Sequence, residues 1–147
     1  MKFDVSLADI ETARTRITGQ VRATPTYRSE KLSRRLGAPT FLKLECLQLA
    51  GSFKVRGVLN KLATLGSAER KRGVVTVSGG NHAIAVAQAA AASGIDALVL
   101  MPKVTPAYNI AQTRRAGATI ELCESAAEAF EKAKAHAAAG RVFIHPY

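Results

Sequence analysis

The feature that most constrains this chain is a regular alternation of apolar and helical segments that begins after Gly73. Val74–Val77 has the pattern of a strand, and a glycine loop leads from it into a helix expected at 81–92. The unit then repeats, with strands expected at 97–101, 119–122 and 142–144, and helices expected from Thr105-Pro106 to Gly117 and from the Ser125/Glu128 capping box to Ala139. Strands that alternate with helices through short loops form parallel sheets with right-handed crossovers. We therefore predict the α/β class, an open parallel sheet with flanking helices.

The residues before Gly73 show no such alternation. The expected elements are a helix at 7–18 behind a Ser6/Asp9 capping pair, a short helix between a Ser29 cap and Gly37, a strand at 40–45, and a helix that the Gly51-Ser52 cap opens. The charged segment 67–73 is expected to separate these elements from the alternating part. Helices with no sheet of their own to cover suggest that the chain is a fragment of a larger, two-domain protein.

Composition sets the class of protein. The 147 residues are 48% hydrophobic and 22% charged, which suffices for a packed core and excludes a disordered tail. The longest uncharged run, 73–95, has polar residues at its centre, and residues 1–8 lack a secretion signal, so we expect no membrane association. Cys46 and Cys123 lie far apart without metal-ligand spacing, which favours reduced, packed thiols, no metal site and a cytoplasmic protein.

The net charge of +10, from 21 Lys and Arg against 11 Asp and Glu, raises the possibility of a nucleic-acid partner. The basic residues occur alone or in pairs, such as Arg34-Arg35 and Arg114-Arg115, and no aromatic residues are interleaved with them to stack bases. We therefore expect no nucleic-acid partner. An anionic ligand, or solubility alone, explains the charge equally well.

Lys54 lies in the segment Gly-Ser-Phe-Lys-Val-Arg-Gly, at the start of the expected third helix. A helix amino terminus disfavours a nearby cation, and the apolar neighbours Phe53 and Val55 add desolvation, so both effects favour the neutral amine. A neutral amine is what a Schiff-base lysine needs. The alternative is an ordinary surface lysine in a first helical turn. Arg56 is expected to be an ion-pair partner or a surface residue.

The segment Ser78-Gly79-Gly80-Asn81-His82 lies where a strand leads into a helix. Glycines let the backbone approach a ligand closely, and a helix amino terminus presents free N–H groups, so the segment suits a carboxylate or a phosphate. Asn81 could also cap the helix, and the alternative is a plain strand-to-helix turn. His82 has no second His, Cys or acidic residue at metal-ligand spacing. The chain also lacks the GxGxxG, GxxxxGK[ST] and GxSxG motifs.

Together, the segments Glu45-Cys46-Leu47-Gln48-Leu49-Ala50-Gly51-Ser52-Phe53-Lys54-Val55-Arg56-Gly57 and Ser78-Gly79-Gly80-Asn81-His82 resemble the two hallmark segments of the fold-type II pyridoxal-phosphate enzymes, which are tryptophan synthase beta-like. The nearest group is threonine/serine dehydratase. The resemblance implies an incomplete two-domain fold and pyridoxal 5'-phosphate as cofactor. It implies conversion of threonine or serine to a 2-oxo acid and ammonia.

The resemblance also implies residue roles. Lys54 would be catalytic and would carry the cofactor as a Schiff base, with Phe53 and Asn81 beside the cofactor. Ser78, Gly79, Gly80, Asn81 and His82 would bind the carboxylate of the amino-acid substrate. Serine racemases carry a Ser at the position of Gly79, where it works as an acid on the opposite face of the substrate, so Gly79 disfavours racemisation. Asn109 occupies a place where many relatives have Lys.

The same resemblance implies a domain division. Residues 1–66, with Lys54, would form the amino-terminal part of the large catalytic domain, 67–140 a small α/β domain, and 141–147 the start of the return to the large domain. The family's phosphate-binding glycine loop lies in a later segment, so residues 1–147 alone should bind the cofactor poorly. The full-length protein is expected to be a homo-oligomer.

Three alternatives stay open from the sequence. Serine racemase, or another lyase or synthase of the same fold type, is the first. A non-catalytic basic fragment that binds a partner is the second, and an α/β lobe without a ligand is the third.

Overall fold

A computed structural model describes residues 5–146. The elements follow in the order α1 (Leu7–Arg16), β1 (Thr26–Arg28), α2 (Glu30–Leu36), β2 (Phe41–Lys43), the short 3-10 turns η1 (Glu45–Leu47) and η2 (Leu49–Gly51), α3 (Lys54–Ala63), α4 (Ser67–Arg72), β3 (Val74–Val77), α5 (Asn81–Ala92), β4 (Ala97–Pro102), α6 (Ala107–Arg115), β5 (Thr119–Cys123), α7 (Ala126–Ala138) and β6 (Val142–Phe143). Within these residues, no helix is both long and apolar enough to cross a membrane.

The centre of the molecule is a four-stranded parallel sheet in the order β5-β4-β3-β6. Val74 pairs with Ala97 on one side and with Val142 on the other, and Leu98 pairs with Thr119. Strands β3 and β4 are buried on both faces, which accounts for their continuous apolar sequence. The predicted α/β class with an open parallel sheet and flanking helices is confirmed.

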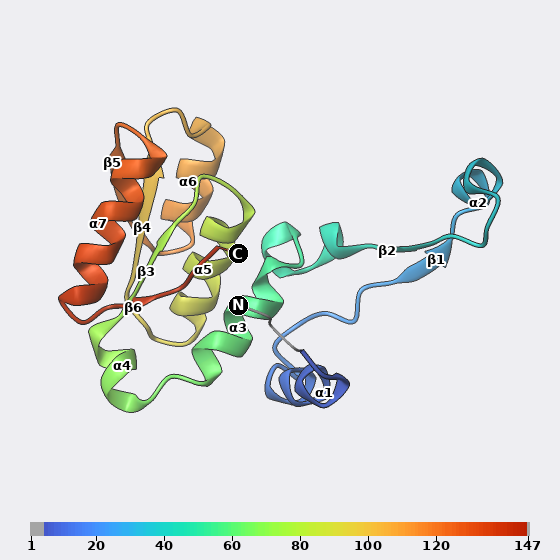
Figure 1. The fold of residues 1–147 in the computed structure, drawn as a ribbon, viewed down its shortest axis with the longest axis horizontal. Coiled ribbons are helices and arrows are strands. Elements are labelled where there is room, and N and C mark those ends of the chain that lie inside the picture. The colour runs from blue at the N-terminus through green and yellow to red at the C-terminus, as the bar shows by residue number, and fades with distance from the viewer. Residues whose placement is uncertain (1–4, 147) are drawn as a thin grey trace.

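Helices cover both faces of this sheet (Figure 1). Helix α7 packs through Ala129 and Ala133 on the face that carries Val75, Val77 and Leu100. Helix α5 lies on the opposite face, and α3 packs on α5 in the larger hydrophobic cluster. That cluster contains Leu59 and Leu62 as well as Val86 and Val99, so it spans the predicted boundary after residue 66. The division into two domains stays a prediction.

Residues 26–43 form an arm that extends away from the sheet (Figure 1). Strands β1 and β2 pair antiparallel, with Thr26 opposite Lys43 and Arg28 opposite Phe41, and α2 connects them. The strand expected at 40–45 is present as β2, and it pairs with β1, a strand that the sequence did not predict. Strand β1 has only three residues, all exposed, so no alternating pattern could reveal it.

Several expected helix starts are confirmed. Ser6 and Asp9 form a capping box, and Ser29 accepts a hydrogen bond from the backbone N–H of Leu32. Ser125 accepts from the N–H of Glu128 at 3.1 Å. The reciprocal bond expected for a capping box, from the N–H of Ser125 to the Glu128 carboxylate, is wrong, because this carboxylate accepts from the N–H of Glu124.

Two expectations near the third helix are wrong. Helix α3 begins after Phe53, and Ser52 is extended, with its buried hydroxyl lacking a hydrogen-bond partner among the described residues. The charged separator 67–73 folds as the short helix α4, because the Glu69 carboxylate accepts from the N–H of Gly66 at 2.8 Å. Five of its six residues are polar and the sixth is Ala68, so the segment has no apolar periodicity that would predict a helix.

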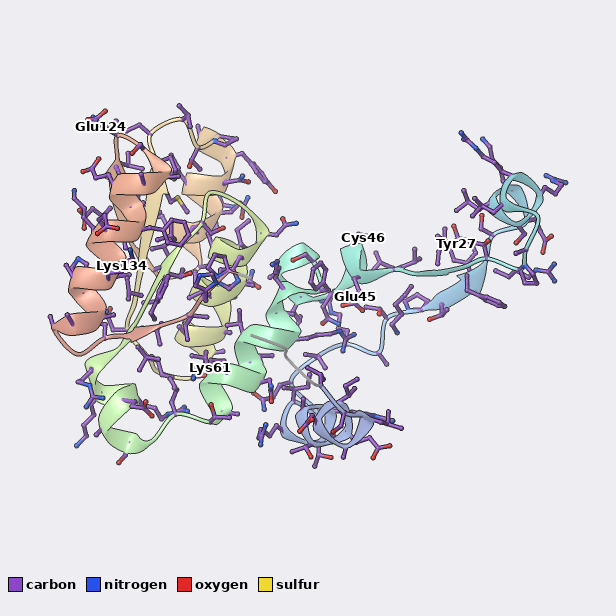
Figure 2. The ribbon with its side chains drawn as sticks, in the orientation of Figure 1. Tyr27, Glu45, Cys46, Lys61, Glu124 and Lys134 are labelled. Atoms are coloured by element: carbon purple, nitrogen blue, oxygen red, sulfur yellow. The ribbon has the colours of Figure 1, made fainter. Side chains whose placement is uncertain are left out.

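The two thiols differ in their surroundings. Cys123 is buried at the end of β5, where burial raises the pKa of its thiol, whereas Cys46 is exposed in η1. Both cysteines are free. The expectation that both thiols are packed is therefore wrong for Cys46, which lies in an irregular turn at the base of the arm (Figure 2).

We predict that Gly73→Ala destabilises the fold by about 1–3 kcal/mol. Gly73 has a φ of 78°, and a Cβ there would lie 2.7 Å from the carbonyl oxygen of Asp96, where β3 starts to pair with β4. Gly57→Ala is the matched control, because it is helical with open space around it and should gain up to about 1 kcal/mol. Urea unfolding measures both, and wild-type stability in Gly73→Ala would contradict this account.

Candidate functional site

Lys54 is the first residue of α3, and its position follows from the packing of that helix. One side of α3 packs into the hydrophobic core through the buried side chains of Val55, Val58 and Leu62. The half-buried Lys54 side chain lies at the edge of this packed side. Its Nζ donates a hydrogen bond to the carbonyl oxygen of Pro146 at 2.7 Å. Nζ also lies 5.5 Å from the ring centre of Phe53. The amine is thus held at the junction of α3 and the chain segment after β6.

Two neighbouring pockets meet at Lys54. One, of about 330 Å³, is lined by Lys54 together with Ser78, Gly79, Asn81 and His82, and lies at the carboxyl ends of β3 and β4. The other, of about 430 Å³, is lined by Lys54, His82 and a set from α3 and the β6 end: Phe53, Gly57, Val58, Lys61, Phe143, Ile144, His145 and Pro146. Ligands of open parallel sheets bind at this edge.

The structure brings nearly all of the predicted site residues together. Lys54, Ser78, Gly79, Asn81 and His82 share the smaller pocket, although 23 residues separate Lys54 from the loop. Gly80 lies within the same loop and does not itself line the pocket. Phe53 is 59% exposed and lines only the larger pocket. Their roles toward a cofactor or substrate stay predictions.

The loop 78–82 leaves the amino terminus of α5 open. Gly80 takes the N-cap position, and no side chain within residues 5–146 caps the helix. The expected cap at Asn81 is therefore wrong: Asn81 is the first helical residue and its side chain is exposed. Free N–H groups and the helix dipole at this end favour an anion.

The His82 side chain is turned toward the sheet. It is 6% exposed, and its Nε2 lies 3.1 Å from Thr76 Oγ1, whose hydroxyl donates to the carbonyl oxygen of Ile144 at 2.7 Å. Burial lowers the pKa of His82, and the charge of Lys54 adds to this effect, so the imidazole is neutral at neutral pH. With Nε2 engaged, the groups that His82 could offer a ligand are its backbone N–H and its Nδ1, which is buried and has no hydrogen-bond partner among the described residues.

A polar network holds the start of α3 against the base of the arm, where Glu45 lies (Figure 2). Arg56 donates from Nε and Nη2 to the two carboxylate oxygens of Glu45, each at 2.8 Å, as the expected ion pair. Thr24 Oγ1 adds a third bond to Glu45 at 2.5 Å. The bonds from Arg56 lower the pKa of Glu45 to about 2 despite the opposing effect of burial. This network is two residues from Lys54 and fixes the direction of the helix start.

Sequence reasoning missed the partners that come from distant segments. Pro146 accepts from Lys54 across 92 residues, and Asn109 donates to the Gly79 carbonyl across 30 residues. Thr76 supports His82 from inside a buried strand. The sequence distinguishes Asn109 only as a difference from relatives that have Lys there, and none of these residues belongs to a motif, so no local pattern could have identified their contacts.

Comparison with known proteins assigns the chain to a family. The family described as "Pyridoxal-phosphate dependent enzyme" matches residues 17–147. The chain belongs to this pyridoxal-phosphate-dependent family. The resemblance seen in the two sequence segments is therefore confirmed at the level of family and fold, and the cofactor of the family is pyridoxal phosphate.

Individual relatives within the family include both lyases and racemases. An L-threonine ammonia-lyase of Thermotoga maritima is 43% identical over 145 residues, which cover 97% of this chain and 36% of that protein. The structure of maize serine racemase superposes with a TM-score of 0.90 at 34% identity, covering 98% of this chain and 44% of that one. The crystal structure of a T.th. threonine deaminase gives a TM-score of 0.85 at 39% identity, with 97% and 46% covered. The chain thus spans less than half the length of these relatives.

We predict that the Glu45–Arg56 pair contributes on the order of 2 kcal/mol of stability at neutral pH and loses it in acid. A carboxylate with a pKa of about 2 when folded, against 4.5 as its usual value, contributes fully above that usual value and loses its contribution as pH falls through about 2. Urea unfolding of wild type and Glu45→Gln should differ by a constant amount from pH 7 to about pH 5 and converge below it.

Glu30→Gln is the matched control for this measurement, because it breaks the exposed Arg28–Glu30 pair and should change stability by less than about 0.5 kcal/mol. A stability difference between wild type and Glu45→Gln that persists unchanged to pH 2 would contradict the assignment.

Proposed function

We propose that this chain provides the lysine and the carboxylate-binding loop of a pyridoxal-phosphate-dependent dehydratase, an ammonia-lyase that converts threonine or serine to a 2-oxo acid and ammonia. The observation that carries the proposal is the shared pocket of Lys54 and the loop 78–82. An amine and an anion-binding backbone side by side suit an amino-acid substrate, which has both an amino group and a carboxylate.

The residues present fit the aldehyde end of pyridoxal phosphate. The cofactor needs a primary amine in a pocket with an apolar wall, and Lys54 Nζ, with Phe53 and Pro146 nearby, provides this. Asn81 would lie beside the ring. When bound, the cofactor supplies an electron sink for the bond that breaks at the substrate α-carbon.

Groups of the chain itself would bind the substrate carboxylate and move the α-proton. Backbone N–H groups of the loop 78–82 would bind the substrate carboxylate at the open end of α5, without an arginine. The Lys54 amine, once free, would accept the α-proton at Nζ and hold it within the pocket. The Pro146 carbonyl, which accepts a hydrogen bond from Nζ, supports an orientation of the amine toward the sheet edge.

Serine racemase is the second candidate, because racemases are among the structural relatives. A racemase needs an acid on the face of the substrate opposite the lysine, and Gly79 has no side chain to supply one. A Cβ at this position would also lie 2.6 Å from Thr105 Oγ1, so the surroundings disfavour any larger residue. This favours the lyase.

Three further features of the whole protein are part of the proposal. The free thiols Cys46 and Cys123 suit the reducing cytoplasm. The residues 26–53 carry several exposed apolar side chains, among them Tyr27, Phe41 and Leu47, which suit burial in a larger domain or in a homo-oligomer. The proposed division is a large-domain part at 1–66, a small domain at 67–140 and a return segment at 141–147.

We predict that this chain, extended past residue 147 by the carboxyl-terminal part of the Thermotoga maritima relative, releases 2-oxobutanoate from L-threonine or pyruvate from L-serine. Lys54→Ala should lower this rate by about 10²–10⁴-fold, because it removes the proton acceptor. Lys61→Ala, in the neighbouring pocket, is the matched control and should retain most of the activity. Residues 1–147 alone should retain little pyridoxal phosphate and show little turnover.

A coupled oxo-acid assay and chiral chromatography of serine separate the candidates. D-serine formed faster than pyruvate would favour the racemase, and equal activity of the Lys54→Ala and wild-type chains would contradict the proposal. Steeply salt-dependent DNA binding without any turnover would favour the non-catalytic basic fragment.

A further inference from the structure

The start of α6 touches the loop 78–82 at two points. Asn109, in the first turn of α6, donates from Nδ2 to the carbonyl oxygen of Gly79 at 2.7 Å. Thr105, just before the helix, is buried, and its hydroxyl lies 2.6 Å from the place of a Cβ on residue 79. The loop therefore packs so closely against the start of α6 that only glycine fits at position 79 without a clash.

These contacts set the orientation of a single peptide group. A trans peptide is planar, so the carbonyl of Gly79 and the N–H of Gly80 point in opposite directions. With the carbonyl directed at Asn109, the N–H of Gly80 is directed at Ser78 Oγ, which it reaches at 3.2 Å. Ser78 lines the pocket of Lys54. Because its hydroxyl oxygen accepts from Gly80, the hydroxyl proton is left to donate.

The peptide between two glycines is the one most able to turn over, since neither residue has a Cβ that restricts its backbone. If it turned over, the carbonyl oxygen of Gly79 would face Ser78 in place of the N–H of Gly80, and the Ser78 hydroxyl would donate to that carbonyl in place of a ligand in the pocket. A carbonyl dipole repels a carboxylate where an N–H attracts it. The anion-binding character of the loop thus depends on what holds the Gly79 carbonyl on its far side.

We infer that Asn109 is a positioning residue of the carboxylate-binding loop, which holds the Gly79–Gly80 peptide so that Gly80 N–H donates to Ser78 Oγ and the Ser78 hydroxyl proton is left to donate into the Lys54 pocket. The inference rests on the proposed function for the role of the loop. Asn109 acts through Gly79, because it does not line the pocket. Thr105 packs so closely against Gly79 that a side chain at position 79 would clash with it.

The test is amide NMR of the ¹⁵N-labelled chain with Asn109→Ala. Loss of the Nδ2 donor should move the Gly80 resonance in the free protein, while the resonances of β3 and β4 stay in place. L-threonine, added as the carboxylate probe, should shift the Ser78 and Gly80 resonances in wild type. Its affinity should fall by about 3- to 10-fold in Asn109→Ala, the effect of one hydrogen bond. Asn109→Gln, which keeps a donor, should recover part of the loss.

Gln112→Ala is the matched control, since it removes a neutral amide from the next turn of the same helix. An Asn109→Ala protein with an unmoved Gly80 resonance and wild-type affinity for L-threonine would overturn the inference and leave the proposed function standing. A wild-type loop that does not respond to L-threonine, in a protein whose Gly80 resonance does move in Asn109→Ala, would overturn the carboxylate-binding function and leave the orientation by Asn109 intact.

Discussion

The packing of α3 on α5 is the constraint on which the site depends. Val58 and Leu62 of α3 are almost completely buried in one cluster with the alanines of α5, and small side chains let two helices approach closely. Because α5 begins directly after the glycine loop and α3 begins at Lys54, this one interface sets the distance between the amine and the loop. The residues proposed to react and the residues that pack are therefore neighbours on the same two helices.

Electrostatics at the site follow from which charges are already paired. Glu45 neutralises Arg56 at the base of the arm, whereas the Lys54 amine donates to an uncharged carbonyl. His82 is neutral, and the open end of α5 adds partial positive charge. A pocket of this kind attracts an anion and still leaves an amine available for chemistry.

The sequence predicted those parts of the structure that local patterns encode. The buried runs of β3 and β4, the helix 81–92 and the two segments around Lys54 and Gly80 all carry such patterns. It did not predict β1, which exists only through pairing with β2. It also placed the helix caps at Ser52 and Asn81, whereas the N-cap positions are those of Phe53 and Gly80. The Pro146 and Asn109 contacts depend on the assembled fold, because their partners are remote in the chain.

The central claim is that one particular amine faces the loop and carries the cofactor. Its most direct test is to load the extended protein with pyridoxal phosphate, reduce it with borohydride and locate the modified lysine by peptide mass spectrometry. Lys61 is the sharpest competitor, since it lines the adjoining pocket. This account predicts a phosphopyridoxyl group on Lys54, and a group carried by Lys61 or by any other lysine in its place would contradict it.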